Sequence, residues 1–179
     1  MTLRVGVVGA GSMAQAHVPA WRALGAEVSV QSLRTPTSFA ERHGVAVADS
    51  LAALVASCDV VDVCSPTSTH EEVVLAALAG GRDVVCEKPL ARTSGAAQSL
   101  VDRATDAGRM LFPAHVVRYF PAYRDAEQRV RAGEVGTVRR LSLRRQVASP
   151  HEGWFHDLEA SGGVVLDLMV HDLDQALWL

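Results

Sequence analysis

The stretch Val5-Gly6-Val7-Val8-Gly9-Ala10-Gly11-Ser12-Met13-Ala14 decides the fold, because an apolar run enters a glycine turn that opens into a helical segment. The turn has the form G-x-G-x-x-A, which is typical of a dinucleotide-binding strand–turn–helix unit. Gly9 permits the tight turn, Gly11 lets the backbone approach a pyrophosphate, and Ala14 lets the helix pack close to the strand. The helix N-terminus then presents free N–H groups and a positive dipole end to the phosphates. We expect the cofactor phosphates to be held by Gly9, Gly11, Ser12 and Met13.

Composition limits the class of protein. With 179 residues, a formal charge of -3 and 49% hydrophobic residues, the chain suits one domain, or one domain with part of a second. The near-neutral charge gives no case for a nucleic acid or a membrane surface as partner. No apolar run reaches the length of a membrane-spanning helix, and residues 1–4 lead straight into a strand with no room for a signal peptide.

The cysteines indicate the compartment. Their odd number and the absence of a C-x-x-C spacing favour small core hydrophobes over disulfides or metal ligands, in a reducing environment. The expected location is therefore the cytoplasm. The three residues are Cys58, Cys64 and Cys86.

The first two thirds of the chain alternate between apolar runs and helical patterns. Strands are predicted at 3–8, 27–33, 45–48, 60–64, 84–86 and 110–115. Helices are predicted at 12–24, 38–43, 51–57 and 94–107, with a further helix ending at residue 79. This alternation predicts an α/β fold with a doubly wound parallel sheet of the Rossmann type. Right-handed crossovers place the loops that follow the strands at one edge of the sheet, where ligands bind.

The pattern changes after residue 115. A helix is predicted at 119–132, a turn at 133–136 and a long strand at 137–147 whose arginines indicate one wet face. A polar loop at 149–163 and a helix at 164–179 complete the chain. We therefore expect a domain boundary near residue 117.

The region after the second strand bears on the choice of dinucleotide. NAD sites usually place an acid there to bind the ribose hydroxyls, but the sequence has no acid between Val28 and Ser38. It offers Ser32 and Arg34, and an arginine pairs with the 2′-phosphate of NADP. The sequence favours NADP, with NAD as the alternative. Arg34 is equally compatible with an ordinary solvated loop cation.

Five motifs follow one another along the chain, namely the segments 9–14, 62–70, Glu87-Lys88-Pro89, 133–136 and 162–171. Together they make the chain resemble the Gfo/Idh/MocA oxidoreductases, named for glucose–fructose oxidoreductase and inositol dehydrogenase. The resemblance implies an NAD(P)-binding Rossmann domain at 1–117. It also implies that 118–179 is the start of a truncated C-terminal α/β domain with a mixed sheet. The implied activity is hydride transfer between NAD(P) and a hydroxyl or carbonyl carbon of a sugar, cyclitol or related polyol.

The same chemistry can be argued from the residues. Oxidation of an alcohol needs a base for the O–H proton and a cation that stabilises the developing alkoxide. Lys88 follows a strand at the ligand edge and suits the second role, although a solvated loop lysine is the alternative. Asp167 and His171 are four residues apart and share a helix face, so the imidazole can act as the base while the carboxylate orients it. An unremarkable helix-surface pair is the alternative there.

Other residues are assigned to cofactor or substrate. Asp174 shares the face of Asp167 and is expected, with Lys88, to bind substrate hydroxyls. His115 lies near the expected cleft, and is either a substrate residue or a core histidine. By resemblance the cofactor is also contacted by Ser65, Pro66, Thr67, His70 and Glu87. Thr67 and His70 are equally compatible with helix caps.

A cluster near residue 154 carries no metal prediction. The spacing of His151, Glu152, His156 and Asp157 fits no known site, and Trp154 and Phe155 are expected to pack as an anchor. Members of the family are usually much longer, so the predicted strand 137–147 lacks its sheet partners. The expected partners are a sugar or polyol substrate and either a second copy or a missing C-terminal half. The alternative function is a non-catalytic NAD(P)-binding fragment or sensor.

Overall fold

The computed structural model describes residues 1–32, 36–148 and 153–179, without the side chain of Trp154. The predictions for Arg34, His151, Glu152 and the Trp154 side chain therefore lie outside the described residues. The chain divides into two compact units, Met1–Pro113 and Ala114–Leu179.

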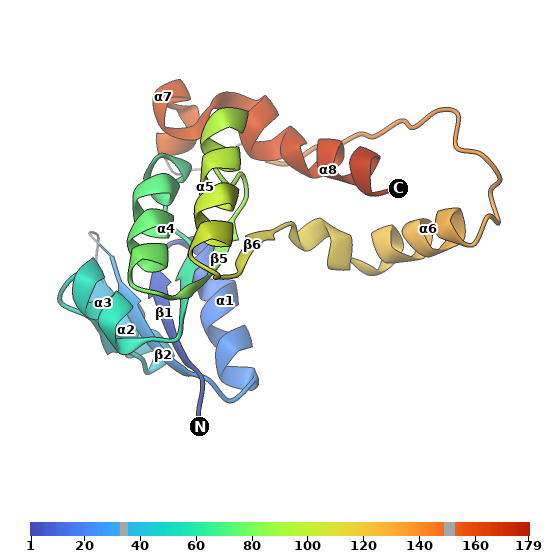
Figure 1. The fold of residues 1–179 in the computed structure, drawn as a ribbon. Helices are drawn as coiled ribbons and strands as arrows, with labels where there is room; N and C mark the ends of the chain where they lie inside the picture. The colour runs from blue at the N-terminus through green and yellow to red at the C-terminus, as the bar shows by residue number, and fades with distance from the viewer. Residues whose placement is uncertain (33–35, 149–152) are drawn as a thin grey trace. The chain divides into compact units, whose positions relative to one another are not determined.

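The first unit is built on a six-stranded sheet with the order β3-β2-β1-β4-β5-β6, and the pairs of neighbours from β3 to β5 are parallel (Figure 1). The strand order reverses direction between β1 and β4, which is where open α/β sheets form their ligand crevice. The Rossmann-type α/β fold predicted from the sequence is confirmed. The strands are β1 Arg4–Val8, β2 Glu27–Gln31, β3 Ala46–Val47, β4 Val60–Val63, β5 Asp83–Glu87 and β6 Leu111–Ala114.

Helices cover both faces of this sheet because alternate strand residues point to opposite sides. Val5, Val7 and Val30 pack on one face with α1 and α2, whereas Val61, Val63 and Val84 pack on the other with α3, α4 and α5. Both clusters are fully buried at their centres, so the two faces form the core of the unit. The helices are α1 Ser12–Ala23, α2 Pro36–His43, α3 Leu51–Ser57, α4 His70–Ala79 and α5 Ser94–Asp106.

Two helix starts are fixed by the side chains that the sequence offers as caps. Ser50 Oγ accepts a hydrogen bond from the Ala53 N–H, and Thr93 Oγ1 accepts one from the Ala96 N–H, each at 3.1 Å. Each bond satisfies one of the first amides of α3 or α5, which have no partner within the helix.

The second unit is mainly helical. The predicted helices 119–132 and 164–179 are present in outline, but the second begins as a π-helical turn, and α7 lies in the predicted loop. After the end of β6 the elements are a 3₁₀ turn Val116–Tyr119, α6 Pro121–Arg131, a 3₁₀ turn Gly153–His156, α7 Leu158–Ser161, a π-helical turn Val165–Met169 and α8 Val170–Trp178.

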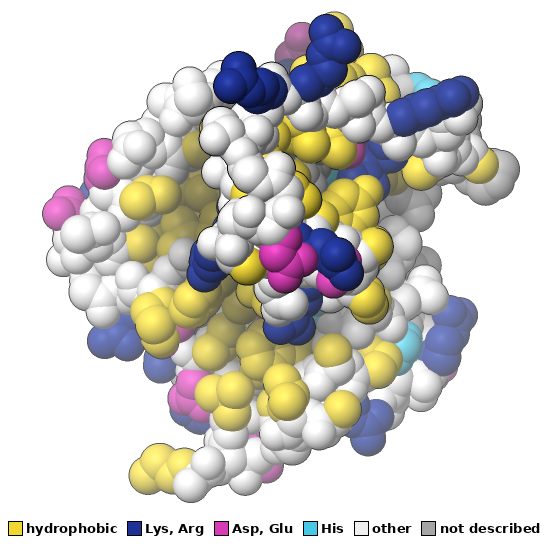
Figure 2. Space-filling model, turned by 90° about the vertical axis from the view of Figure 1, so that its right-hand side faces the viewer, with side chains coloured by type: hydrophobic (Ala, Val, Ile, Leu, Met, Phe, Trp, Pro, Cys, Tyr) yellow, Lys and Arg dark blue, Asp and Glu magenta, His cyan; other side chains and the backbone are white. Residues whose placement is uncertain are grey.

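The predicted strand 137–147 is wrong, because residues 138–148 form neither helix nor strand. A strand forms when a neighbouring strand satisfies its N–H and C=O groups, and the described part of the chain provides no such neighbour for this segment. Its apolar side chains reach solvent: Val138, Leu141, Leu143 and Val147 are each at least 38% exposed. Figure 2 shows apolar side chains beside charged ones on one face of the molecule.

Candidate functional site

The glycine turn after β1 has the geometry that a dinucleotide phosphate needs. Gly9 has a φ of 110°, and a Cβ there would lie 2.7 Å from the carbonyl carbon and oxygen of Cys64. Gly11 is exposed, and a Cβ there would meet no atom within 4 Å, so open space adjoins the backbone at this point. Ser12 and Met13 form the first turn of α1, and Gly11 supplies no side-chain cap to that turn. A pyrophosphate therefore fits beside these amides.

The remaining residues assigned to the cofactor in this unit follow β2, β4 and β5. Ser32 comes directly after β2, whose Gln31 C=O accepts a bond from the Gly9 N–H at 2.8 Å. Because carboxyl ends of parallel strands share one edge of the sheet, Ser32, Ser65–His70 and Glu87–Lys88 gather at the same edge as Gly9.

The loop after β4 is fixed by a buried histidine. The His70 ring is fully buried, with Nδ1 2.9 Å from the Pro89 carbonyl oxygen and Nε2 2.9 Å from the Ser65 carbonyl oxygen. Burial lowers the pKa of His70, against the opposite effect of the hydrogen bonds with Ser65 and Pro89. The ring faces carbonyl groups instead of helix amides, so it is not a helix cap. It joins the loop after β4 to the turn after β5.

The other residues of this loop differ in exposure. Ser65 Oγ lies 2.7 Å from Thr69 Oγ1, which donates to the Pro66 carbonyl oxygen at 2.8 Å. Thr67 is buried and Pro66 is exposed. The loop is thus ordered by its own hydrogen bonds and presents Pro66 at the surface.

The turn after β5 carries the only lysine of the sequence. Lys88 is half-buried, and its backbone N–H donates to the Glu87 carboxylate at 3.1 Å. Glu87 itself is buried, and its other oxygen faces His17. Both oxygens of Glu87 are therefore engaged inside the protein. The Lys88–Pro89 peptide bond is cis.

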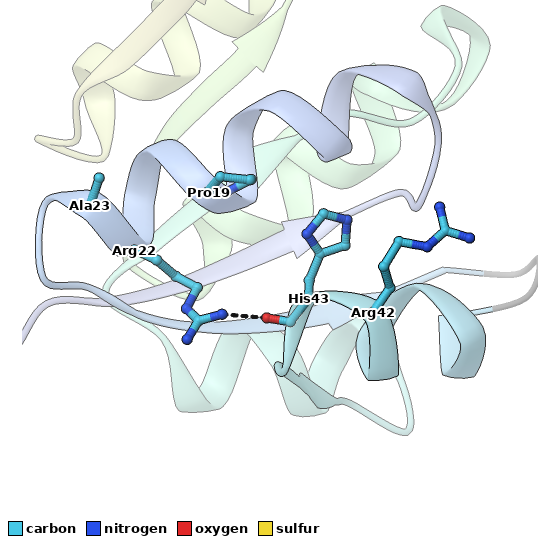
Figure 3. Close-up of a pocket in the computed structure, with 5 residues that line it drawn as sticks. All are labelled: Pro19, Arg22, Ala23, Arg42 and His43. Carbon is cyan, nitrogen blue, oxygen red and sulfur yellow. Dashed lines mark hydrogen bonds between the residues drawn. The ribbon is translucent and has the colours of Figure 1, made fainter.

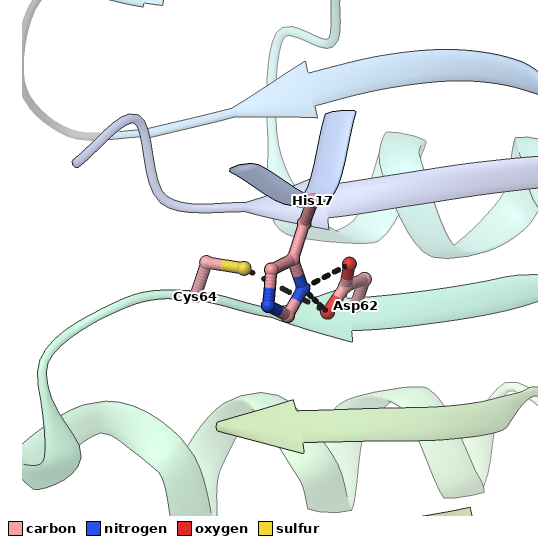
Figure 4. A group of neighbouring side chains, drawn as sticks. All are labelled: His17, Asp62 and Cys64. Carbon is pink, nitrogen blue, oxygen red and sulfur yellow. Dashed lines mark hydrogen bonds and ion pairs between the residues drawn. The ribbon is translucent and has the colours of Figure 1, made fainter. Parts of the chain in front are cut away.

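Beneath this edge lies a polar cluster that sequence reasoning missed. His17 from α1 places Nδ1 2.9 Å from Asp62 Oδ2 and Nε2 3.0 Å from Glu87 Oε1. Trp21 Nε1 donates to Asp62 at 2.6 Å. The Cys64 thiol lies 3.7 Å from the same carboxylate, and Figure 4 shows both with His17. Burial works to lower the pKa of His17, but hydrogen bonds with Asp62, Cys64 and Glu87 prevail and raise it to about 12. Two signals were available: an acid inside an apolar strand, and a histidine four residues before a tryptophan.

His17, Asp62 and Cys64 are close enough to hold a metal ion, since their ligand atoms lie within 4.8 Å of one another. The hydrogen bonds favour protons over a metal. Asp62 already accepts the Trp21 N–H, and burial raises the pKa of the Cys64 thiol to about 12, which keeps it protonated.

In the second unit, an ion pair holds the residue assigned to substrate hydroxyls. The Arg118 guanidinium binds both oxygens of Asp174, at 2.5 and 2.8 Å, and Asp174 is 8% exposed. This hydrogen bond raises the pKa of Arg118. His115 Nδ1 lies 3.6 Å from Asp174, and the Arg118 guanidinium lies over the Trp178 ring at 5.6 Å. Sequence reasoning missed Arg118, whose partner lies 56 residues away.

Asp167 and His171 lie in one continuous helical stretch, Asp167 in the π-helical turn and His171 in α8, and both are half-buried. A π-helical turn inside a helix is frequent at functional sites. A second ion pair anchors α8, because Arg145 binds Asp172 at 2.9 Å with both side chains less than 20% exposed. The segment 138–148 is thereby tied to the helix that carries His171.

An open pocket of about 480 Å³ lies elsewhere on the first unit, lined by Pro19, Arg22, Ala23, Arg42 and His43 (Figure 3). The Arg22 guanidinium donates to the His43 carbonyl oxygen there. Both α1 and α2 start at the carboxyl edge of the sheet and run away from it, so their C-terminal ends lie at the opposite edge. Of the residues assigned to cofactor or substrate, none that the structure describes lines this pocket.

The comparisons with known proteins identify the family. The model described as "Oxidoreductase family, NAD-binding Rossmann fold" matches residues 3–115, and the model of the GFO/IDH/MocA C-terminal domain matches residues 123–179. The chain therefore belongs to the Gfo/Idh/MocA oxidoreductase family, as the motifs predicted.

Relatives within this family act on sugars and cyclitols, as their names state. The chain is 35% identical to 1,5-anhydro-D-fructose reductase of Ensifer adhaerens over 96% of its length, and 30% identical to inositol 2-dehydrogenase of Acidiphilium cryptum over 100%. It spans about half of each, 54%. Levoglucosan dehydrogenase in complex with NADH and levoglucosan superposes with a TM-score of 0.86 at 26% identity, covering 100% of this chain and 54% of that one.

Among the described residues, no helix is both long and apolar enough to cross a membrane.

Proposed function

We propose that the chain is the cofactor-binding part of an NAD(P)-dependent dehydrogenase or reductase that transfers a hydride to or from a sugar, cyclitol or related polyol. The observation that carries the proposal is the turn Glu87-Lys88-Pro89, which sets the sole lysine at the same sheet edge as the Gly9 turn. The names of the relatives support the substrate class.

Each assigned side chain has a role in this proposal. The nicotinamide supplies the hydride acceptor or donor when a dinucleotide is bound. Lys88 carries the positive charge that stabilises the substrate alkoxide, and His171 takes or returns the hydroxyl proton. Asp167 orients the imidazole and stabilises its charged form. His115 and Asp174 contact substrate hydroxyls, Asp174 with Arg118 as its fixed counter-ion.

The proposed dinucleotide is NADP, with NAD as the alternative. Its support is the absence of an acid between Val28 and Ser38 together with Ser32 and Arg34 in that region. The phosphates are proposed to lie on Gly9, Gly11, Ser12 and Met13, and the ribose and nicotinamide half along Ser65, Pro66, Thr67, His70 and the Glu87 turn. The cytoplasm stays the proposed location.

The test is titration of the 179-residue chain with NADPH and NADH, followed by turnover on a panel of polyols and sugars. We expect both nucleotides to bind, NADPH more tightly, and we expect Lys88→Ala to lower kcat by roughly 10²–10⁴-fold. Arg109→Ala is the matched control, since Arg109 pairs with Asp83 at the start of β5, at the opposite edge of the sheet. It removes one cation and leaves kcat unchanged.

A second candidate function is an NAD(P)-binding fragment or sensor without catalysis, which the segment 138–148 favours because it pairs with no strand among the described residues. Nucleotide binding without turnover of any compound on the panel would select this second function. Failure to bind either nucleotide would refute both.

A further inference from the structure

The His17 side chain lies at the junction of two elements with separate roles. It comes from α1, the helix that begins at the glycine turn, and it contacts Asp62 of β4 and Glu87 of β5. Glu87 in turn accepts the backbone N–H of Lys88. One chain of hydrogen bonds thus runs from the phosphate-binding helix to the turn that carries the sole lysine.

The geometry of these hydrogen bonds indicates the charge of the His17 ring. Each ring nitrogen of His17 faces a carboxylate oxygen at 2.9–3.0 Å. A neutral imidazole donates through one nitrogen and would turn its lone pair toward the other carboxylate, which is repulsive. The imidazolium donates to both and lies between two buried acids, as buried charges require.

We propose that His17 is a positioning residue, an imidazolium clamp between Asp62 and Glu87 that holds the Lys88 turn in register with the dinucleotide-binding helix. The groups that face its ring are Asp62 and Cys64 from β4, Glu87 from β5, and Trp21 through Asp62. His70 fixes the other side of the same turn through the Pro89 carbonyl oxygen. The role of Lys88 in hydride transfer rests on the proposed function, whereas the clamp itself does not.

Because Lys88 is the only lysine, a chain labelled with [15N]lysine gives one backbone amide signal, that of Lys88. His17→Gln replaces the charged donor that faces Asp62 and Glu87 by a neutral amide, and we expect it to speed exchange of the Lys88 amide with solvent about tenfold or more. Trp21→Phe is the matched control, because Trp21 also lies on α1 and donates to Asp62 but not to Glu87. It leaves the Lys88 exchange rate within about twofold.

Measurements on the unmutated chain keep the test independent of whether a variant folds. The [15N]histidine spectrum is expected to show the His17 ring doubly protonated through and well above pH 6.5, the usual pKa of histidine. Since folding raises the pKa of His17 to about 12, its contribution to the free energy of unfolding is complete below about pH 6.5. This contribution is lost as the pH rises toward 12. His17→Gln lacks this decline.

In a chain that turns over a polyol, His17→Gln is expected to lower kcat about tenfold with the KM for substrate little changed, whereas Trp21→Phe keeps kcat within about twofold. A neutral His17 ring, equal Lys88 exchange in the two variants, or stoichiometric Zn²⁺ uptake abolished by His17→Gln would each overturn the clamp. Absence of turnover with the amide result intact would refute the proposed function alone.

Discussion

The two units of the chain fix their polar residues by different means. In Met1–Pro113, the glycine turn, the loop after β4 and the turn after β5 extend directly from paired strands and are joined by His17 and His70. In Ala114–Leu179, His171 and Asp174 lie on a helix held by the ion pairs of Arg118 and Arg145. Backbone pairing holds an inner strand along its whole length, whereas an ion pair fixes only the side chains that it joins.

This difference indicates which part of the proposed site is held in place before any ligand binds. The sheet edge that carries the glycine turn and the loops after β4 and β5 depends on a sheet whose strands lie within residues 4–114. The second unit has no such support over residues 138–148, whose apolar side chains stay exposed. We therefore expect this sheet edge to be more rigid than α8, and three predictions test that contrast.

The largest expected effect is in amide hydrogen exchange. The central strands β1 and β4 are hydrogen-bonded on both sides, so their amides exchange only when the sheet opens. Residues 138–148 form neither helix nor strand, and we expect exchange near the rate of an unfolded chain. Exchange mass spectrometry should separate the two by several orders of magnitude. If the amides of residues 138–148 were as protected from exchange as those of β1, the expected difference in rigidity between the two units would be wrong.

The second prediction concerns the glycine turn. Gly9→Ala places a Cβ 2.7 Å from the Cys64 backbone at a φ of 110°, and we expect it to lower the free energy of unfolding by about 3 kcal/mol or more. Gly11→Ala is the control, because its φ is -87° and open space adjoins it. It should leave stability within about 0.5 kcal/mol and weaken nucleotide binding. Urea unfolding and nucleotide titration of both variants provide the check, and equal stability losses would contradict the assignment of Gly9.

The same contrast explains what could be predicted from the sequence. Apolar runs, glycine stops and caps such as Ser50 act locally, so the strands and helices of the first unit follow from the order of residues. The family motifs point to Gly9, Lys88 and His171 as site residues because each lies next to a recognisable turn or helix start, and these assignments stay predictions. These signals concern neighbours along the chain.

What could not be predicted depends on contacts that are distant in sequence. The alternating segment 137–147 has the pattern of a strand, but pairing needs a partner strand that the described residues do not provide. His17 contacts Asp62 and Glu87, which lie 45 and 70 positions further along the chain. Arg118 and Asp174 are separated by 56 positions. No periodicity in one segment reports such a pairing.

The smallest effect is expected in the ion pairs of the second unit. Arg118→Met leaves the buried Asp174 carboxylate without its guanidinium. Loss of one partner from a fully buried pair costs about 3–5 kcal/mol, but Arg118 is 38% exposed, so we expect about 1–3 kcal/mol. The control is Arg129→Met on α6, whose pair with Asp125 is solvent-exposed and should contribute at most about 0.5 kcal/mol. Exchange of the α8 amides should rise in Arg118→Met alone, with β1 and β4 unaffected. Equal effects of the two variants would mean that the Arg118 pair does not hold α8, and that the second unit owes its order to apolar contacts instead.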